Sequence, residues 1–402
     1  MSLGTAPLPT SSPLFFDAHS TTPCDPAVVE AMLPYFTARF GNAASLQHRF
    51  GWEAQEAVEE ARQHVATLVG ARLRDVIFTS GATEANNLAL VGTIEGVRQA
   101  RGRDDAAVPH VVTLATEHPA VLDPCAWLET QGVRVTRVPV RPDGLVDLDT
   151  LAAATVPGTT LVSVMAANNE IGVLQPLDAI ARLAHDAGAF MHTDASQAAA
   201  FVPIDMAALG IDMLSYTAHK LYGPKGGGAL VVRRASKVPI APLHHGGGHE
   251  RGLRSGTLNV PAIVGFGHAV KLSRERRDED VPRISALRDR LWTRLREALP
   301  GVHLRGAAEP RLPHNLNVGF DGLSGRDLVM GLTDVAVSPG AACASTSAAP
   351  SHVLLAIGLT EAEAKSSLRF GLLRTTTEAE VDMLADRLSN LVSALRSQRS
   401  LR

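Results

Sequence analysis

The chain has 402 residues, of which 45% are hydrophobic and 20% are charged, a composition typical of a globular protein with more than one lobe. Its 38 Lys and Arg residues and 41 Asp and Glu residues give a formal net charge of -3, so no basic excess indicates a nucleic acid or a membrane surface as a partner. No apolar run reaches the length of a membrane span, and residues 1–13 lack the pattern of a signal peptide. The three cysteines are too few for a disulfide framework, which favours a reducing cytoplasm.

Short apolar strands alternate with helical segments through the first 260 residues. A helix is expected at residues 85–94, directly after the first strand, and another at residues 177–186. Apolar strands that alternate with helices predict an α/β fold with a mostly parallel sheet covered on both faces. The expected strands lie at residues 76–79, 111–114, 133–138, 161–165, 190–193, 213–216 and 229–232.

The pattern changes in the last third of the chain, which predicts a second, smaller α+β lobe. Helices are expected at residues 260–274 and 283–299, and shorter strands near residues 316–318 and 368–370. An amphipathic helix at residues 378–397 closes the chain. We therefore expect a flexible arm at residues 1–14, a large ligand-binding domain at residues 15–260 and a small C-terminal domain at residues 261–402.

Chemically rich side chains follow several of the expected strands, where an open α/β sheet binds its ligand. They are Thr83, His118, Asn169, Asp194 and Lys220. Lys220 stands behind Thr217 and His219 and before a glycine-rich turn. A lysine there can form a Schiff base with a carbonyl group, although a solvated loop lysine is the alternative for any single lysine.

Two of these positions suit a phosphorylated pyridine ring. The turn Gly81, Ala82 and Thr83 opens a helix after a strand, where free N–H groups bind phosphate, unless Thr83 only caps the helix. Asp194 ends a buried strand, where a carboxylate needs a partner such as a protonated pyridine nitrogen, or serves as a structural cap. Gln197 lies three residues on, within reach of a ring hydroxyl.

Other candidate residues each have a bland alternative. His118 can stack on a ring and move protons, and the Asn169 amide can hydrogen-bond a ring oxygen, but both residues also suit ordinary structural roles. Arg369 lies in an apolar strand, where its fork matches a substrate carboxylate or a structural ion pair. Cys343 lies among small residues in a loop that could carry a thiol into a site, or it is a buried, inert thiol.

The histidines at residues 244–249 are separated by three glycines, a spacing that does not hold metal ligands in place, so no metal site is expected. The following residues 254–257 offer an arginine and hydroxyl groups, which suit a phosphate or a carboxylate.

Taken in order, these motifs resemble those of cysteine desulfurases, pyridoxal-phosphate enzymes of the aminotransferase class V group. The resemblance extends from about residue 16 to residue 378. Each motif is weak alone, and their order makes them specific. The matching stretches are residues 21–23, 40–42, 79–84, 116–118, 168–172, 194–197, 218–220, 246–251, 254–257 and 366–370.

The resemblance implies a fold-type I transferase with a seven-stranded sheet, and a role for each matched residue. Lys220 would bind the cofactor aldehyde, Asp194 would pair with the pyridine nitrogen and His118 would stack on the ring. The ring hydroxyl would be bonded by Asn169 and Gln197, and the phosphate would be bound by Ala82, Thr83, Thr217, His219 and, from the neighbouring subunit of a homodimer, Thr257. The substrate carboxylate would be bound by Asn42, Asn169 and Arg369. Cys343 would be the nucleophile that accepts sulfur.

The implied reaction converts L-cysteine to L-alanine and leaves the sulfur as a persulfide on Cys343, for an iron–sulfur scaffold or a tRNA-thiolation carrier. Two alternatives remain: a selenocysteine lyase or other class V lyase on the same scaffold, and a non-catalytic protein that only docks a sulfur acceptor. The loop departs from the family pattern at Pro339 and Ala341, where serines are usual, and the N-terminal motif departs at Ser20 and Ala43, where alanine and proline are common.

Overall fold

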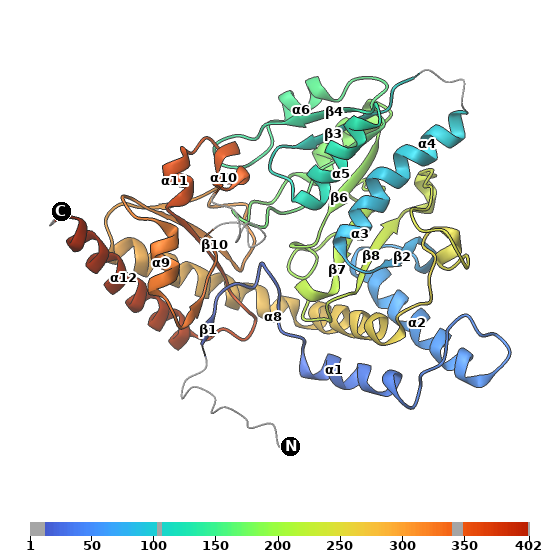
Figure 1. Cartoon of the computed structure of the whole chain (residues 1–402), viewed down its shortest axis with the longest axis horizontal. Coiled ribbons are helices and arrows are strands. Elements are labelled where there is room, and N and C mark those ends of the chain that lie inside the picture. The colour runs from blue at the N-terminus through green and yellow to red at the C-terminus, as the bar shows by residue number, and fades with distance from the viewer. Residues whose placement is uncertain (1–12, 103–106, 340–348, 401–402) are drawn as a thin grey trace.

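A computed structural model of the chain describes residues 13–102, 107–339 and 349–400, and Figure 1 shows two groups of elements with a long helix that runs from one group to the other. The larger group is built around a seven-stranded sheet in the order β2-β8-β7-β6-β5-β3-β4. Only β8 runs antiparallel to its neighbours, so the expected mostly parallel sheet is confirmed. The strands are β2 (Val76–Thr79), β3 (His110–Leu114), β4 (Arg134–Val138), β5 (Leu161–Ser163), β6 (Phe190–Asp194), β7 (Met213–Thr217) and β8 (Gly228–Val232).

Successive strand residues enter two separate cores, because side chains alternate between the faces of a strand. Ile77 belongs to one core and Phe78 to the other, and Leu161 and Val162 divide in the same way. The first core packs under α3 (Ala82–Asn87), α4 (Thr93–Arg101) and α5 (Pro119–Thr130). The second core packs under α2 (Arg49–Leu68), α6 (Leu148–Ala154), α7 (Leu177–Asp186) and the long helix α8. Both faces of the sheet are therefore covered, as continuous apolar strands require.

The two helices expected at residues 260–274 and 283–299 are one helix, α8 (Val260–Ala298), so that prediction was wrong. Pro282 lies inside it, where a proline removes a hydrogen bond and costs about 3 kcal/mol. The helix continues because buried residues on both sides of the polar stretch, such as Val270 and Leu287, hold its two halves. It packs against α2 at one end and against α12 (Glu378–Ser400) at the other.

The smaller group contains an antiparallel sheet in the order β12-β10-β9. Its strands are β9 (Val302–Leu304), β10 (Asn315–Phe320) and β12 (Ser367–Gly371), and its helices are α9 (Gly325–Gly331), α10 (His352–Ala356), α11 (Glu361–Lys365) and α12. The expected strands near residues 316–318 and 368–370 lie within this sheet.

The N-terminal segment connects the two groups, as the dark blue strand in Figure 1 shows. β1 (Leu14–Phe15) pairs in parallel with β11 (Val335–Ala336), and Asp17 bridges to Gly371. The chain then crosses to the large sheet, where the Thr22 hydroxyl donates to the His219 carbonyl (3.0 Å), before α1 (Pro26–Met32) begins. The domain boundaries themselves stay a prediction. No helix within the described ranges is long and apolar enough to cross a membrane.

Candidate active site

A cavity of about 630 Å³ opens at the carboxyl ends of the parallel strands, beside the smaller sheet. It brings together side chains from β6, β7, β12 and the first turns of α3 and α5. The predicted site residues that line it are Ala82, Thr83, His118, Asn169, Asp194, Gln197, Thr217, His219, Lys220 and Arg369. Strand ends far apart in the sequence therefore converge, as the sheet topology requires.

Lys220 ends the 3₁₀ turn η4 (Ala218–Lys220) that follows β7. Its Nζ atom donates hydrogen bonds to the Ser20 carbonyl (2.7 Å) and to the His19 carbonyl. The N-terminal segment thus forms the wall against which the lysine rests. Both of these acceptors are neutral backbone oxygen atoms.

Asp194 ends β6 and is 8% exposed. One carboxylate oxygen accepts from Asn86 Nδ2 (2.7 Å) and the other from the Ser196 backbone N–H (2.9 Å). Among the described residues both of these donors are neutral, and a buried carboxylate favours a cationic partner. The hydroxyl of Ser196, on the same wall, has no hydrogen-bond partner in the part of the chain that the structure describes. This corner of the cavity therefore suits a ligand with a protonated nitrogen.

The first turn of α3 supplies free N–H groups to the cavity. Gly81 precedes it with a φ of 155°, a conformation that other residues rarely adopt, and a Cβ atom at Gly228 would lie 2.5 Å from the Gly81 Cα atom, so both residues must stay glycine. Glu84 accepts from the Ser80 N–H (2.8 Å) and from Arg254 Nε (2.8 Å). Burial alone would raise the pKa of Glu84, but these donors lower it. The turn is therefore braced while its N-terminal N–H groups remain available to an anion.

Two histidines of the cavity are neutral imidazoles. Burial lowers the pKa of His118, an effect that Asp194 opposes, and His118 Nδ1 accepts from the Ala120 N–H (3.0 Å) at the start of α5. The neutral ring must then carry its proton on Nε2. Burial, together with the charge of Lys220, lowers the pKa of His219 to about 4. His219 Nδ1 lies 3.1 Å from the hydroxyl oxygen of Thr21.

Arg369 is 1% exposed and occupies β12. Its Nη2 atom pairs with Asp17 Oδ1 (2.8 Å), and its Nη1 atom donates to the Asn169 carbonyl (3.0 Å). The structural ion pair that the sequence left open is therefore present. Arg369 also lines the cavity, and its buried Nε atom has no partner among the described residues.

Two predicted residues, Asn42 and Thr257, lie outside the cavity lining. Asn42 is exposed and is not part of the cavity lining, and its side chain accepts from the Ala44 N–H (2.9 Å). Thr257 is likewise exposed and outside the lining. Cys343 lies outside the described residues. On either side of residues 340–348, Ser338 pairs with Arg369, and His352 Nε2 lies 2.9 Å from the Glu117 carbonyl.

Two buried carboxyl groups were missed from the sequence. Burial raises the pKa of Glu117 well above its usual value and also raises the pKa of Glu170. Glu170 lines the cavity and accepts from Ser351 Oγ (2.5 Å). Each is a direct neighbour of a residue that the sequence singled out, His118 and Asn169, which was the available signal. His19 and His352 also line the cavity, and no local pattern indicated either of them.

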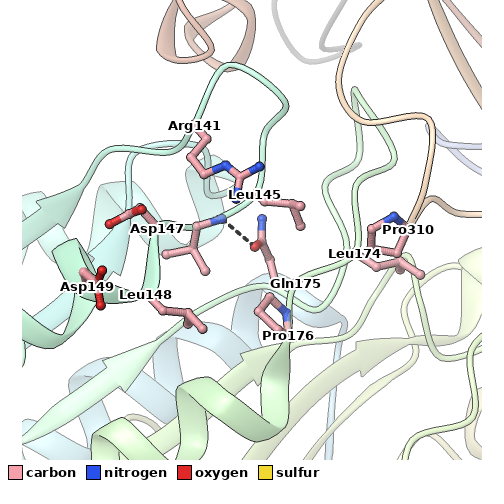
Figure 2. A pocket seen from close by; sticks show the side chains of 10 residues that line it. Arg141, Leu145, Asp147, Leu148, Asp149, Leu174, Gln175, Pro176 and Pro310 are labelled. Carbon is pink, nitrogen blue, oxygen red and sulfur yellow. Dashed lines mark hydrogen bonds between the residues drawn. The ribbon is translucent and has the colours of Figure 1, made fainter.

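A second hollow, of about 480 Å³, lies apart from these residues (Figure 2). Its Gln175 side chain accepts from the Val146 N–H (2.9 Å) and donates to the Gly144 carbonyl (2.8 Å). The amide is therefore already used to brace a turn. Arg141 forms an ion pair with Asp143. None of the predicted site residues lines this hollow, and we do not assign it a function.

Comparisons with known proteins agree with the geometry. The family described as aminotransferase class-V matches residues 14–384. The chain is 50% identical over 389 residues to a protein named cysteine desulfurase IscS from Anaeromyxobacter dehalogenans (strain 2CP-C), covering 97% of this chain and 95% of the relative. A protein of the same name from Rickettsia akari (strain Hartford) is 46% identical over 384 residues, with 96% and 92% covered.

Solved structures give the same result. One described as a NifS-like protein has a TM-score of 0.87 and 35% identity, over 95% of this chain and 99% of the other. Another, described as SspA in complex with cysteine, has a TM-score of 0.78 and 32% identity, over 90% and 100%. The chain therefore belongs to the cysteine desulfurases of the aminotransferase class-V family.

Proposed function

We propose that the protein converts L-cysteine to L-alanine with pyridoxal 5'-phosphate as its cofactor and Cys343 as the acceptor of the sulfur. The main support is the convergence of Lys220, Asp194 and the first turn of α3 in one cavity of a chain of this family. Membership of the family indicates the reaction, and the cavity contains the amine, the carboxylate and the backbone N–H groups that this reaction uses.

The cavity fits the cofactor in size and in chemistry. Small-molecule sites measure about 300–1,000 Å³, and this one is about 630 Å³. Asp194 would pair with the ring nitrogen, and the N–H groups at Ala82 and Thr83 would bind the phosphate with Thr217 and His219. Because His219 is neutral, it would contribute a hydrogen bond rather than a charge to the phosphate. When bound, the cofactor supplies an electron sink for the substrate's α-carbon.

Lys220 and His118, which both line the cavity, would handle protons. Lys220 Nζ would take the substrate's α-proton and return it, which requires the amine to leave the Ser20 carbonyl. His118 would stack on the ring and present its Nε2–H, because its Nδ1 atom is engaged by the backbone. In this arrangement His118 acts first as a donor and accepts a proton only when the Ala120 contact opens.

Arg369 would bind the substrate carboxylate, with the side-chain amides of Asn169 and Asn42. The ion pair with Asp17 supports a positioning effect, because it holds the guanidinium in one orientation at the cavity wall. The guanidinium charge at the cavity lining would attract the carboxylate.

Cys343 would attack the substrate sulfur as a thiolate and retain it as a persulfide. The flanking residues support this role by their position. Ser338 is paired with Arg369, and Ser351 with the cavity residue Glu170, so these two described residues, which come before and after Cys343 in the sequence, lie beside the cavity. An unperturbed cysteine has a pKa of about 8.5 and is mostly protonated at neutral pH, so a base must assist the attack.

A homodimer would complete the site. Large apolar side chains that are 51% to 65% exposed gather between α1 and the first turn of α2: Leu33, Phe36, Phe40, Leu46, Phe50 and Trp52. Such a patch on a single chain favours an interface. Thr257 is exposed and could reach the phosphate in the partner's cavity.

The sulfur acceptor would be an iron–sulfur scaffold or a tRNA-thiolation carrier, in the reducing cytoplasm. No observation favours the selenocysteine lyase or the docking protein.

The test is an absorption spectrum of the purified protein before and after addition of L-cysteine, with mass mapping of Cys343. We expect a visible cofactor band that changes with cysteine, release of alanine, and a mass gain of one sulfur atom on Cys343. A colourless protein with no mass change on Cys343 would overturn the proposal.

A further inference from the structure

A chain of buried hydrogen bonds leads from the smaller sheet into the cavity. Arg311 Nη1 donates to Asn315 Oδ1 (2.8 Å), and Asn315 Nδ2 lies 3.0 Å from His19 Nε2. His19 Nδ1 lies 2.9 Å from Oε1 of Gln197, which lines the cavity. Gln197 Nε2 in turn donates to the His19 carbonyl (3.1 Å). The first three side chains are buried, so water does not compete for these contacts.

The arginine determines which atom donates and which accepts in each of these side-chain hydrogen bonds. A guanidinium can only donate, so Asn315 must turn its oxygen to Arg311 and its NH₂ group to His19. The same NH₂ group donates to the Glu170 carbonyl (3.1 Å), which independently requires this orientation. His19 Nε2 must then accept, and the proton of the neutral ring lies on Nδ1. Burial lowers the pKa of His19 well below its usual value, with His314 and Arg369 adding to the effect, so the ring carries a single proton.

The consequence falls on Gln197. His19 Nδ1–H donates to the carbonyl oxygen of the amide, and one of the two amide N–H groups donates back to the His19 backbone. We propose that His19 is a positioning residue, which orients the Gln197 amide so that an N–H group rather than its oxygen faces the cavity. The backbone carbonyl of residue 19 also holds the amide nitrogen, and the ring adds a second contact on the amide oxygen; without the ring the amide would be held by that carbonyl alone and would turn more freely.

This orientation selects the ionised form of a ring hydroxyl. An N–H group stabilises an oxygen that has lost its proton, and hydrogen bonds to charged groups are stronger than neutral ones. The inference rests on the proposed cofactor, whose ring hydroxyl Gln197 would bond. His19 would therefore lower the pH at which the visible absorption band of the bound cofactor changes.

The structure contains a matched control for His19. The His314 ring stacks on His19 with a centroid distance of 4.3 Å and on Phe201 with 4.0 Å. Both histidines are almost fully buried, but His314 Nδ1 has no hydrogen-bond partner in the described structure. His314 therefore shares the ring stack with His19 but takes no part in the hydrogen bonds described above that lead from Arg311 to Gln197.

The test is a pH titration of the visible absorption of the holoenzyme. His19→Phe keeps a flat ring in the stack and removes both ring nitrogens, and we expect its midpoint to rise by about one pH unit, roughly the effect of one hydrogen bond to a charged group. His314→Phe should keep the wild-type midpoint. Apart from the two histidines that are exchanged, the charged and titratable groups that face His19 and the cavity are the same in both variants: Lys220, Lys225, Arg369, Glu84, Glu170, Asp194, His118, His219 and His352.

A double variant distinguishes an effect that acts through the His19–Gln197 hydrogen bond from a general disturbance of the cavity. If His19 acts through Gln197, then His19→Phe adds no shift in a Gln197→Leu background, whereas independent effects would add. His19→Asn is the second variant, should His19→Phe fail to fold. Its short amide cannot contact Gln197 and Asn315 together, so its midpoint should rise as well.

The outcomes distinguish this inference from the proposed function. A wild-type protein that shows no visible band with added cofactor overturns the proposed cofactor and, with it, the positioning role of His19. A band whose midpoint is the same in His19→Phe as in the wild type, that shifts equally in His314→Phe, or that shifts additively in the double variant overturns the positioning role alone.

Discussion

The guanidinium of Arg62 and the carboxylate of Glu250 form a two-pronged ion pair in the protein interior. Both N···O distances are 2.8 Å, and Glu250 Oε2 also accepts from the Phe78 N–H (2.9 Å). Glu250 has a φ of 48°, a backbone conformation unfavourable for a residue with a side chain. The pair therefore anchors the segment that carries Arg254 and Thr257 to α2 and β2.

Removal of one partner should expose the cost of that anchor. We expect Glu250→Ala to lower the free energy of unfolding by about 3–5 kcal/mol, because the buried Arg62 loses its two-pronged partner and keeps only the half-exposed Glu59. Glu59 contacts the same arginine from a half-exposed position (3.0 Å), and Glu59→Ala should cost less than about 1 kcal/mol. Urea titrations of the two variants measure the difference, and equal losses would contradict this account.

Lys220 should be required for the covalent attachment of the cofactor. Lys220→Ala should lose the visible band and the activity, because no amine remains at the end of β7 to bind the aldehyde. Lys225 lines the same cavity and is exposed, and Lys225→Ala should keep the band. Absorption spectra after dialysis against the cofactor decide the matter, and a band that persists in Lys220→Ala would assign the attachment to another amine.

Cys343 should be the only cysteine needed for sulfur transfer. Cys343→Ala should keep the cofactor band and lose sulfide release from L-cysteine. Burial raises the pKa of the Cys125 thiol to about 12, so Cys125→Ala should retain sulfide release. Burial also raises the pKa of Cys24, which makes Cys24→Ala a second control. Undiminished sulfide release by Cys343→Ala would exclude it as the nucleophile.

Arg369 should affect substrate binding more than cofactor binding. Arg369→Lys keeps the charge but loses the planar fork, so KM for L-cysteine should rise about tenfold, equal to about 1.4 kcal/mol. The visible band should be unchanged. Arg374→Lys, which alters an ion pair with Asp25 outside the cavity lining, should leave KM near the wild-type value. Steady-state kinetics with L-cysteine give both values, and an unchanged KM in Arg369→Lys would leave the ion pair with Asp17 as its whole role.

Buried histidines should make the fold sensitive to acid. Burial lowers the pKa of His192 to about 4 and that of His314 to about 3, against about 6.5 in the unfolded chain. Between these values the unfolded chain binds more protons than the folded one, so stability is complete above about pH 6.5 and falls as the pH drops. Each such histidine contributes a slope of about 1.4 kcal/mol per pH unit in this range.

Denaturant titrations between pH 4 and pH 6.5 test that slope. In His314→Phe the slope should decrease by the contribution of one histidine, because the new ring cannot take up a proton. The solvent-exposed His245 provides the control, and His245→Phe should leave the slope unchanged. A slope unaltered by His314→Phe would show that this ring does not control the acid sensitivity.

Much of the fold could be predicted because its signals are local. The strand at residues 76–79 and the helix at residues 177–186 were predicted with the bounds that β2 and α7 have. Apolar runs and alternation are written in neighbouring residues, so the parallel sheet followed from them. The long helix α8 was divided at its polar middle and Pro282, because packing at its two ends, which overrides the local signal, is not visible in the local sequence.

The sequence by itself determined the fold class, the family and the residues that follow the strands, because strand ends place their next residues at one edge of a parallel sheet. Only the tertiary structure decided which side chains those residues meet. Asp17 and Arg369 are 352 positions apart, and His19 and Gln197 are 178 apart, yet each pair is in contact. The path of the N-terminal segment between the two sheets makes these contacts, and long-range proximity of this kind depends on the packed core rather than on any local pattern.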